Sequence, residues 1–208
     1  MKKKIAILGS TGSIGKTLFN ILLKEQKNCE LLLLTAHKSH KILLKQAKIL
    51  NVKNLIITNK KDYEILKEKT KKTKIRVFNN FKNLDKIFKK KIDYVMSSIS
   101  GINGLEPTIK IIKFTKKIAI ANKESIICGW NLIQSQLKKN KTEFIPVDSE
   151  HFSIWYGLKN FKNNNLENII LTASGGPFYK TTVDNFKKIK VSDALKHPNW
   201  RMGKKIST

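Results

Sequence analysis

The chain has 208 residues, 40% of them hydrophobic, which is enough to bury the core of one large domain or of a domain and a half. Its 42 basic residues exceed its 15 acidic ones, so the net charge is +27, a balance often found in nucleic-acid-binding proteins. We favour a lysine-saturated surface without a nucleic-acid partner over that class. The lysines are spread over every predicted element, and only Arg76 and Arg201 offer the side chain usual in base contacts.

The apolar runs are too short for a secretory leader or a membrane span. Residues 5–8 follow a basic N-terminus, but the run stops at Gly9, and residues 31–34 are far shorter than a transmembrane helix. Cys29 and Cys128 have no metal-site spacing, and we predict that both are reduced thiols in the core. We therefore expect a cytoplasmic protein that binds neither membranes nor nucleic acid.

The first fifty residues predict a strand, a glycine-rich turn, a helix and a second strand. Residues 5–8 are a continuous apolar run of the kind buried in parallel sheets, and residues 30–35, with four leucines at their centre, predict the next buried strand. Between them, Gly9 would allow a tight exit from the strand, Gly12 a close approach to a pyrophosphate, and Gly15 close packing of the helix. The spacing is one residue longer than the commonest dinucleotide fingerprint, so a plain turn without a ligand is the alternative.

The end of the second strand distinguishes between two cofactors. NAD-binding sheets usually place Asp or Glu there to hold the ribose 2′-hydroxyl. This chain has Ala36, His37, Lys38 and Ser39 instead, and a cation beside a hydroxyl favours a 2′-phosphate. The sequence therefore predicts an NADP site.

Strands and helices continue to alternate as far as residue 147. The patterns predict strands at residues 55–57, 75–78, 92–96, 118–120 and 143–147, and helices at 42–50, 61–72, 81–88, 105–114 and 124–137. This alternation predicts an α/β fold with a doubly wound parallel sheet. Beyond residue 151 we expect a helix at 152–158 and a strand at 169–172.

Polar segments follow three of these strands, at residues 97–101, 121–125 and 148–150. Because ligands of parallel sheets bind at the carboxyl ends of the strands, we expect the segments to face one site. Asn122 could cap the following helix or hydrogen-bond a ribose or nicotinamide, and Lys123 could contact a substrate phosphate or hydroxyl.

Asp148 and Glu150 stand out in a chain poor in acids. In an extended backbone, residues two apart point to the same side, so the two carboxylates would converge while Ser149 faces away. Two hard oxygen ligands predict a Mg²⁺ or Mn²⁺ site. The alternative is that Asp148 only caps the next helix.

Two later segments add candidate contacts. Small residues at 173–176 leave the backbone free to surround an anion, with Ser174 either a ligand or part of a structural turn. Residues 197–205 are polar and basic and carry Trp200 and Met202, which predicts a lid over a site or a coil anchored by its tryptophan.

Together, five stretches resemble the 1-deoxy-D-xylulose 5-phosphate reductoisomerase family of the non-mevalonate isoprenoid pathway. They are collinear along the whole chain: Gly9-Ser-Thr-Gly-Ser-Ile-Gly15, Ala121-Asn-Lys-Glu-Ser125, Pro146-Val-Asp-Ser-Glu-His151, Thr172-Ala-Ser-Gly-Gly-Pro-Phe178 and His197-Pro-Asn-Trp-Arg-Met-Gly-Lys-Lys-Ile-Ser207. The resemblance implies cofactor contacts at Thr11, Gly12, Ser13, Ile14, His37, Lys38, Ser39, Asn122, Glu124 and Gly203. His37 stands where relatives often have glycine.

The same resemblance implies the chemistry of the remaining residues. Asp148 and Glu150 would bind Mg²⁺, Mn²⁺ or Co²⁺. Substrate contacts are implied at Lys123, Ser149, Glu150, Ser174, His197 and Trp200, with catalytic roles for Lys123, Asp148, Glu150 and His197. The implied reaction is the NADPH-dependent and metal-dependent rearrangement and reduction of the sugar phosphate 1-deoxy-D-xylulose 5-phosphate to 2-C-methyl-D-erythritol 4-phosphate.

The resemblance also implies a domain division. A Rossmann-like NADPH-binding domain would occupy residues 1–147, and the first part of an α+β catalytic domain residues 148–208. Full-length members are expected to be homodimers. In the family, the sequence continues into segments with a third metal carboxylate and most of the phosphate pocket, so we expect this incomplete chain alone to bind NADPH weakly and turn over little substrate.

Three other interpretations stay open at this stage. One is a degraded or incompletely recorded gene product without function, which would be distinguished by whether the chain folds cooperatively. Another NADP-linked dehydrogenase on the same fold would bind the cofactor without requiring a divalent metal. A basic nucleic-acid-binding protein would bind duplex DNA in competition with NADPH.

Overall fold

A computed structural model describes residues 1–159, 166–172 and 175–197. The chain divides into two compact units, Met1–Asn160 and Phe161–Thr208. Each unit is described separately below.

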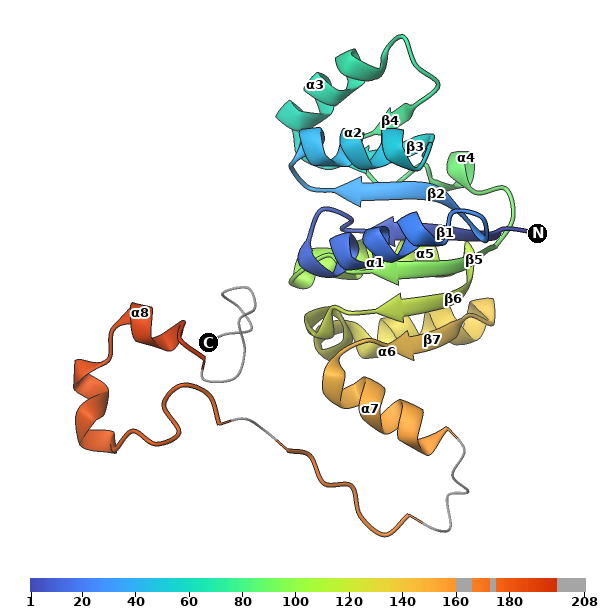
Figure 1. The fold of residues 1–208 in the computed structure, drawn as a ribbon. Coiled ribbons are helices and arrows are strands. Elements are labelled where there is room, and N and C mark those ends of the chain that lie inside the picture. The colour runs from blue at the N-terminus through green and yellow to red at the C-terminus, as the bar shows by residue number, and fades with distance from the viewer. Residues whose placement is uncertain (160–165, 173–174, 198–208) are drawn as a thin grey trace. The chain divides into compact units, whose positions relative to one another are not determined.

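The first unit is built on one seven-stranded sheet in which every paired strand is parallel (Figure 1). The strand order is β4-β3-β2-β1-β5-β6-β7. In chain order the strands are β1 (Lys3–Leu8), β2 (Cys29–Ala36), β3 (Asn54–Ile57), β4 (Arg76–Phe78), β5 (Ile92–Ser97), β6 (Thr115–Ile120) and β7 (Glu143–Pro146). The chain winds outward from β1 in one direction and then returns to β5 on its other side, which confirms the predicted doubly wound sheet.

Helices lie on both faces of this sheet (Figure 1). In chain order they are α1 (Ser13–Lys24), α2 (His40–Ile49), α3 (Lys60–Thr70), α4 (Leu84–Ile87), the short 3-10 helix η1 (Ile102–Gly104), α5 (Leu105–Ile112), α6 (Lys123–Asn140) and α7 (Ser149–Leu158). Successive residues of a strand point to opposite faces, so Ile5 and Ile7 join one buried cluster while Ala6 and Leu8 join the other. Apolar residues of α1, α2 and α3 complete the first cluster, and those of α4, α5 and α6 the second.

Two details of the first unit differ from expectation. The helix expected at 81–88 is only Leu84–Ile87, because the Asn80 side chain accepts a hydrogen bond from the Lys82 backbone at 2.9 Å and holds a turn there. Cys128 was expected in the core, but it is exposed, while Cys29 is half-buried. The buried face of α6 runs through Gly129 and residues four apart from it, and Cys128 is turned about 100° away from that face.

The second unit contains the short 3-10 helix η3 (Val183–Lys188) and helix α8 (Val191–Ala194) among its described residues. The strand expected at 169–172 is wrong: these described residues belong to no strand, and Ile170 is 85% exposed. An apolar run becomes a strand only where a neighbouring strand accepts its hydrogen bonds, and the sheet of the first unit does not include it. Within the described parts of the chain, no helix combines the length and apolar character of a membrane span.

Candidate functional site at the carboxyl edge of the sheet

The predicted polar segments begin side by side at one edge of the sheet. Leu8 at the end of β1 pairs with Ser97 of β5, Ser97 pairs with Ile120 of β6, and Ile120 pairs with Pro146 of β7. The glycine turn and residues 98–101, 121–122 and 147–148 therefore leave the sheet at the same level. The point between β1 and β5, where the winding reverses, is where open α/β sheets bind ligands.

Two of the three glycines in the turn after β1 are required by the protein's own packing. Gly9 has φ of +80°, and a Cβ there would lie 2.8 Å from the Ser98 carbonyl oxygen. A Cβ on Gly15 would lie 2.3 Å from the Gly9 carbonyl oxygen, which confirms the predicted close packing of the helix. At Gly12, by contrast, φ is −76° and the nearest protein atom to a Cβ would be 3.4 Å away. Gly12 thus leaves room for something outside the fold.

The first turn of α1 suits an anion. Gly12 is its N-cap residue, no side chain caps the helix, and no acidic residue lies in its first turn. Gly12, Ser13 and Ile14 are exposed and Thr11 is half-buried. The N–H groups and positive dipole end of the helix are therefore presented at the surface, as a pyrophosphate site requires.

A buried polar network, missed in the sequence, holds the turn in place. The Ser10 hydroxyl donates to Gln46 Oε1 at 2.8 Å, and Gln46 Nε2 donates back to the Ser10 carbonyl at 3.0 Å. The Gly9 N–H donates to the Thr35 hydroxyl at 2.9 Å. The available signal was Gln46, a polar residue one position before Ala47 on the buried face of α2. Buried hydrogen-bonded groups of this kind fix the turn's conformation.

The predicted 2′-phosphate residues lie in the exposed loop between β2 and α2. His37, Lys38 and Ser39 are all exposed, and Ser39 occupies the N-cap position of α2 in a left-handed conformation with φ of 68°. The Ser39 hydroxyl makes no capping bond, and the first turn of α2 carries no acidic residue. His37 Nδ1 lies 2.8 Å from the Thr58 hydroxyl.

Asn122 caps α6, as the more conservative interpretation expected. Its Oδ1 accepts from the Ser125 backbone at 3.2 Å, while its Nδ2 donates to the carbonyls of Ile99 and Gly101 at 2.5 and 2.6 Å. The side chain is buried and ties the segment after β5 to the helix after β6. Lys123 and half-buried Glu124 form the first turn of α6 beside it. A cofactor contact by Asn122 or Glu124 stays a prediction.

The geometry expected for Asp148 and Glu150 is wrong. Residues 148–150 are not extended: Asp148 is the N-cap residue of α7, and Glu150 lies in the first turn of that helix. The Asp148 side chain makes no capping bond either. Instead, Oδ2 lies 2.6 Å from His151 Nδ1 and Oδ1 lies 3.9 Å from Lys123 Nζ. Helix α7 begins at Ser149, and a helical residue at that position prevents Asp148 and Glu150 from pointing to the same side as they would in an extended backbone.

The Asp148 carboxyl is largely buried beside charged side chains. Burial raises the pKa of the Asp148 carboxyl, whose side chain is 14% exposed. Hydrogen bonds with His151 and Glu150 outweigh burial, and the charge of Lys123 adds to them, so this pKa lies below its usual range. Asp148 is thus an ionised oxygen donor, and Glu150 follows two positions later in the first turn of the same helix. Among the described residues, no group of three or more His, Cys, Asp or Glu side chains is placed to hold a metal ion.

The remaining predicted residues lie at the start of α7, in the second unit or outside the described residues. Ser149 is exposed at the start of α7, and its carbonyl accepts from the Ser153 hydroxyl at 2.7 Å. His197 is half-buried in the second unit. Four others lie outside the described residues: Ser174, Trp200, Met202 and Gly203.

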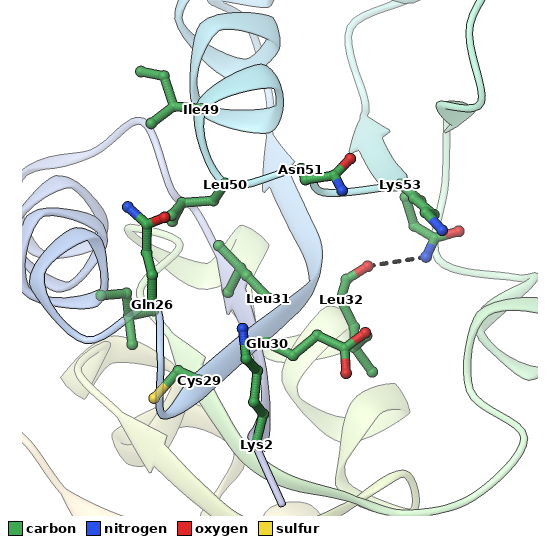
Figure 2. Close-up of a pocket in the computed structure, with 12 residues that line it drawn as sticks. Lys2, Gln26, Cys29, Glu30, Leu31, Leu32, Ile49, Leu50, Asn51 and Lys53 are labelled. Atoms are coloured by element: carbon green, nitrogen blue, oxygen red, sulfur yellow. Dashed lines mark hydrogen bonds between the residues drawn. The ribbon is translucent and has the colours of Figure 1, made fainter.

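A cavity of about 410 Å³ lies at the opposite, amino edge of the sheet (Figure 2). Lys2, Cys29 and Asn54, at or next to the first residues of their strands, line it together with Glu30 and Leu31. The carbonyl of Leu32, labelled in Figure 2, accepts a hydrogen bond from Asn54 Nδ2 at 2.9 Å. None of the predicted site residues lines this cavity.

Comparison with known proteins matches nearly the whole chain to one family. The family model for 1-deoxy-D-xylulose 5-phosphate reductoisomerase matches residues 5–129, and the model for the C-terminal domain of the same reductoisomerase matches residues 144–208. The reductoisomerase of Pelagibacter ubique is 60% identical over 207 residues, covering 99% of this chain and 53% of that protein. The enzyme of Wolbachia pipientis subsp. Culex pipiens is 43% identical, covering 99% of this chain and 52% of its own length.

Solved structures agree. A Zymomonas mobilis reductoisomerase in complex with NADPH superposes with a TM-score of 0.83 and 30% identity, covering 95% of this chain and 52% of that one. A reductoisomerase in complex with NADPH, fosmidomycin and magnesium gives a TM-score of 0.85 and 28% identity, covering 99% and 53%. The chain spans about half the length of the curated relatives it matches.

Proposed function

Since this chain belongs to the 1-deoxy-D-xylulose 5-phosphate reductoisomerase family, we propose that it acts in the NADPH-dependent, divalent-metal-dependent conversion of 1-deoxy-D-xylulose 5-phosphate to 2-C-methyl-D-erythritol 4-phosphate. The observation that carries this proposal is the register of the sheet. Because of this register, three segments begin at the same edge of the sheet: the glycine turn after β1, the Asn122–Lys123 segment after β6 and the Asp148 segment after β7. A dinucleotide site and a carboxylate pair on one edge are what a metal-assisted reductase needs.

The glycine turn and the loop after β2 would hold the cofactor. Open space at Gly12 and the uncapped first turn of α1 fit a pyrophosphate. Lys38 and the Ser39 hydroxyl fit a 2′-phosphate, because a cation and a donor meet an anion there. Asn122, whose amide is engaged by two carbonyls and a backbone N–H, would act by holding the segment after β5 in place. NADPH itself supplies the hydride.

Asp148 and Glu150 would hold the divalent cation. Both are hard oxygen donors, and the low pKa of Asp148 keeps it charged at neutral pH. The metal acts as a Lewis acid when bound. Lys123, 3.9 Å from Asp148 and 55% exposed, could reach a substrate oxygen, and His151 orients the Asp148 carboxylate. Substrate contacts at Ser149, Ser174, His197 and Trp200 complete the proposal.

We also propose the division into an NADPH-binding domain, residues 1–147, and a metal- and substrate-binding part from residue 148. The protein would work in the cytoplasm as a homodimer on a small sugar phosphate, without nucleic-acid or membrane partners. The spread of lysines over the surface supports electrostatic attraction of that anionic substrate.

Calorimetric titration of the purified chain tests the proposal. NADPH should bind, and the NADPH-loaded chain should bind 1-deoxy-D-xylulose 5-phosphate only when Mg²⁺ or Mn²⁺ is present. Cofactor binding with no metal dependence would instead indicate another NADP-linked dehydrogenase. Displacement of NADPH by duplex DNA, in a salt-dependent manner, would indicate a nucleic-acid-binding protein.

A further inference from the structure

A histidine–aspartate pair adjoins the loop proposed to take the 2′-phosphate. His40, the first residue of α2, points its Nδ1 at Asp62 Oδ1, 2.5 Å away. The same carboxylate oxygen accepts from the His40 backbone N–H at 3.3 Å. The two side chains are only 16% and 18% exposed. Asp62 is therefore held by both the ring and the backbone of the residue that follows Ser39.

The loop itself is fastened to the segment that carries Asp62. The Thr58 N–H donates to the Ala36 carbonyl at 3.1 Å, and the Asn59 N–H donates to the His37 carbonyl at 2.9 Å. Asn59 also caps α3 by accepting from the Asp62 backbone at 3.1 Å. These bonds hold Asp62 close to the cationic loop of residues 37–39.

Ser39 needs this support. Its left-handed φ of 68° is a conformation that residues other than glycine adopt only when the surroundings hold them there. The bonds from His40 to Asp62 lie directly after it in the chain and fix where α2 begins. Because the Ser39 hydroxyl makes no capping bond, it stays available to a ligand.

The charge of Asp62 would oppose a 2′-phosphate. NAD-binding sheets use a carboxylate at the end of the second strand to hold a 2′-hydroxyl and disfavour a phosphate. Asp62 belongs to the first turn of α3, after β3, but its contact with His40 places a carboxylate beside the loop that follows β2. The His40 hydrogen bond is the largest influence lowering the pKa of Asp62, and the charge of Lys38 also contributes. Asp62 is therefore ionised at neutral pH, and through its bonds to His40 it is tied to the residue that follows Lys38 and Ser39 in the chain.

We propose that His40 is a specificity-determining positioning residue, which occupies the Asp62 carboxylate so that Lys38 and Ser39 serve the 2′-phosphate of NADPH. The inference rests on the proposed NADPH function and adds how the chain tells NADPH from NADH. Without the His40 ring, the Asp62 carboxylate would be left without its main hydrogen-bond partner and would offset the positive charge of Lys38.

The experiment compares NADPH and NADH affinities of the 208-residue chain and its variants by calorimetric titration. His40→Ala should weaken NADPH binding by about tenfold, the order expected for one unbalanced charge near a phosphate, and change NADH binding by less than about twofold. Asp62→Asn added to His40→Ala should restore NADPH affinity to within about threefold, because it removes the repelling charge. Lys48→Ala, which removes a cation from the last turn of the same helix, is the matched control and should leave the ratio unchanged.

A purely structural role would give a different pattern. If His40→Ala weakens NADPH and NADH equally, and Asp62→Asn does not restore binding, the inference is overturned. Should His40→Ala fail to fold by circular dichroism, Asp62→Asn alone decides: NADPH binding as tight as wild type or tighter supports the inference, and weaker binding overturns it. If the wild-type chain binds no NADPH, the proposed function fails together with this inference. If the wild-type chain binds NADPH but His40→Ala leaves the ratio of NADPH affinity to NADH affinity unchanged, only this inference is overturned.

Discussion

Alanine at Gly12 and at Gly15 should have opposite consequences for folding and for cofactor binding. Gly15 is fully used by the fold: an added Cβ would sit 2.3 Å from the Gly9 carbonyl oxygen and 2.6 Å from Ser10 Cα. Both are backbone atoms, and Cβ contacts under 3.0 Å are essentially never observed. The helix must therefore move away from the turn.

The expected magnitudes follow from that geometry. Overpacking against a backbone costs about 3 kcal/mol at the upper end, and the helix propensity of alanine returns about 1 kcal/mol, so Gly15→Ala should lower the free energy of unfolding by about 2 kcal/mol. At Gly12 the nearest atom is 3.4 Å away and φ is negative. Gly12→Ala should therefore cost less than about 1 kcal/mol, the usual range for a change at an N-cap.

Urea unfolding followed by circular dichroism measures the first effect, and NADPH titration the second. Gly12→Ala should fold like wild type yet bind NADPH at least about tenfold more weakly, because its methyl group fills the space proposed for the pyrophosphate. Gly157→Ala, in α7 with nothing within 4 Å of the added Cβ, controls for glycine replacement in a helix and should not affect NADPH. Undiminished NADPH binding by Gly12→Ala would refute the reasoning.

Three further predictions test other parts of the same edge. Gln46→Leu removes both bonds to Ser10 and takes the side-chain donor away from the buried Ser10 carbonyl, while the Ser10 hydroxyl keeps its bond to the Thr35 carbonyl. Urea unfolding should therefore show a loss of about 1–3 kcal/mol in the free energy of unfolding. No loss would mean that the network does not stabilise the turn. The pKa of Asp62 in the folded protein is below its unfolded value of 3.8, so the Asp62 carboxylate stabilises the fold fully above pH 3.8 and less as the pH falls through the folded pKa. Acidification from pH 6 to pH 3 should therefore destabilise the wild type more than Asp62→Asn. Equal losses of stability would contradict the pairing of Asp62 with His40. Asp148→Asn keeps the shape of the side chain but removes its charge, so the affinity for Mn²⁺, measured by electron paramagnetic resonance, should fall by at least about tenfold. Ser153→Ala, on the same helix, is the control and should leave the Mn²⁺ affinity unchanged. An unaltered Mn²⁺ affinity in Asp148→Asn would exclude Asp148 as a ligand.

The sheet was predictable because both its faces are buried. Residues such as Ile7 and Leu8 are each fully buried on opposite faces, so the strands stand out as continuous apolar runs between amphipathic helices. The strand order then follows from the reversal of winding, and with it the edge that gathers the polar segments.

What escaped prediction depends on contacts between residues distant in sequence or on where a helix starts. His40 and Asp62 are 22 positions apart, and Ser10 and Gln46 are 36 apart, so neither pair forms a recognisable local pattern. Asp148 and Glu150 were expected to converge along an extended segment, whereas Asp148 is the N-cap residue and Glu150 lies in the first turn of a helix. Apolar residues 169–172 have the composition of a strand but no strand to pair with in the described sheet.

The most direct test of the central claim is where NADPH binds. Amide resonances of the isotope-labelled chain, recorded during an NADPH titration, should shift at residues 9–15, 37–40, 98–101 and 121–123, all at or beside the carboxyl edge of the sheet. Shifts concentrated instead at Lys2, Cys29 and Asn54, around the cavity at the amino edge, would contradict the account.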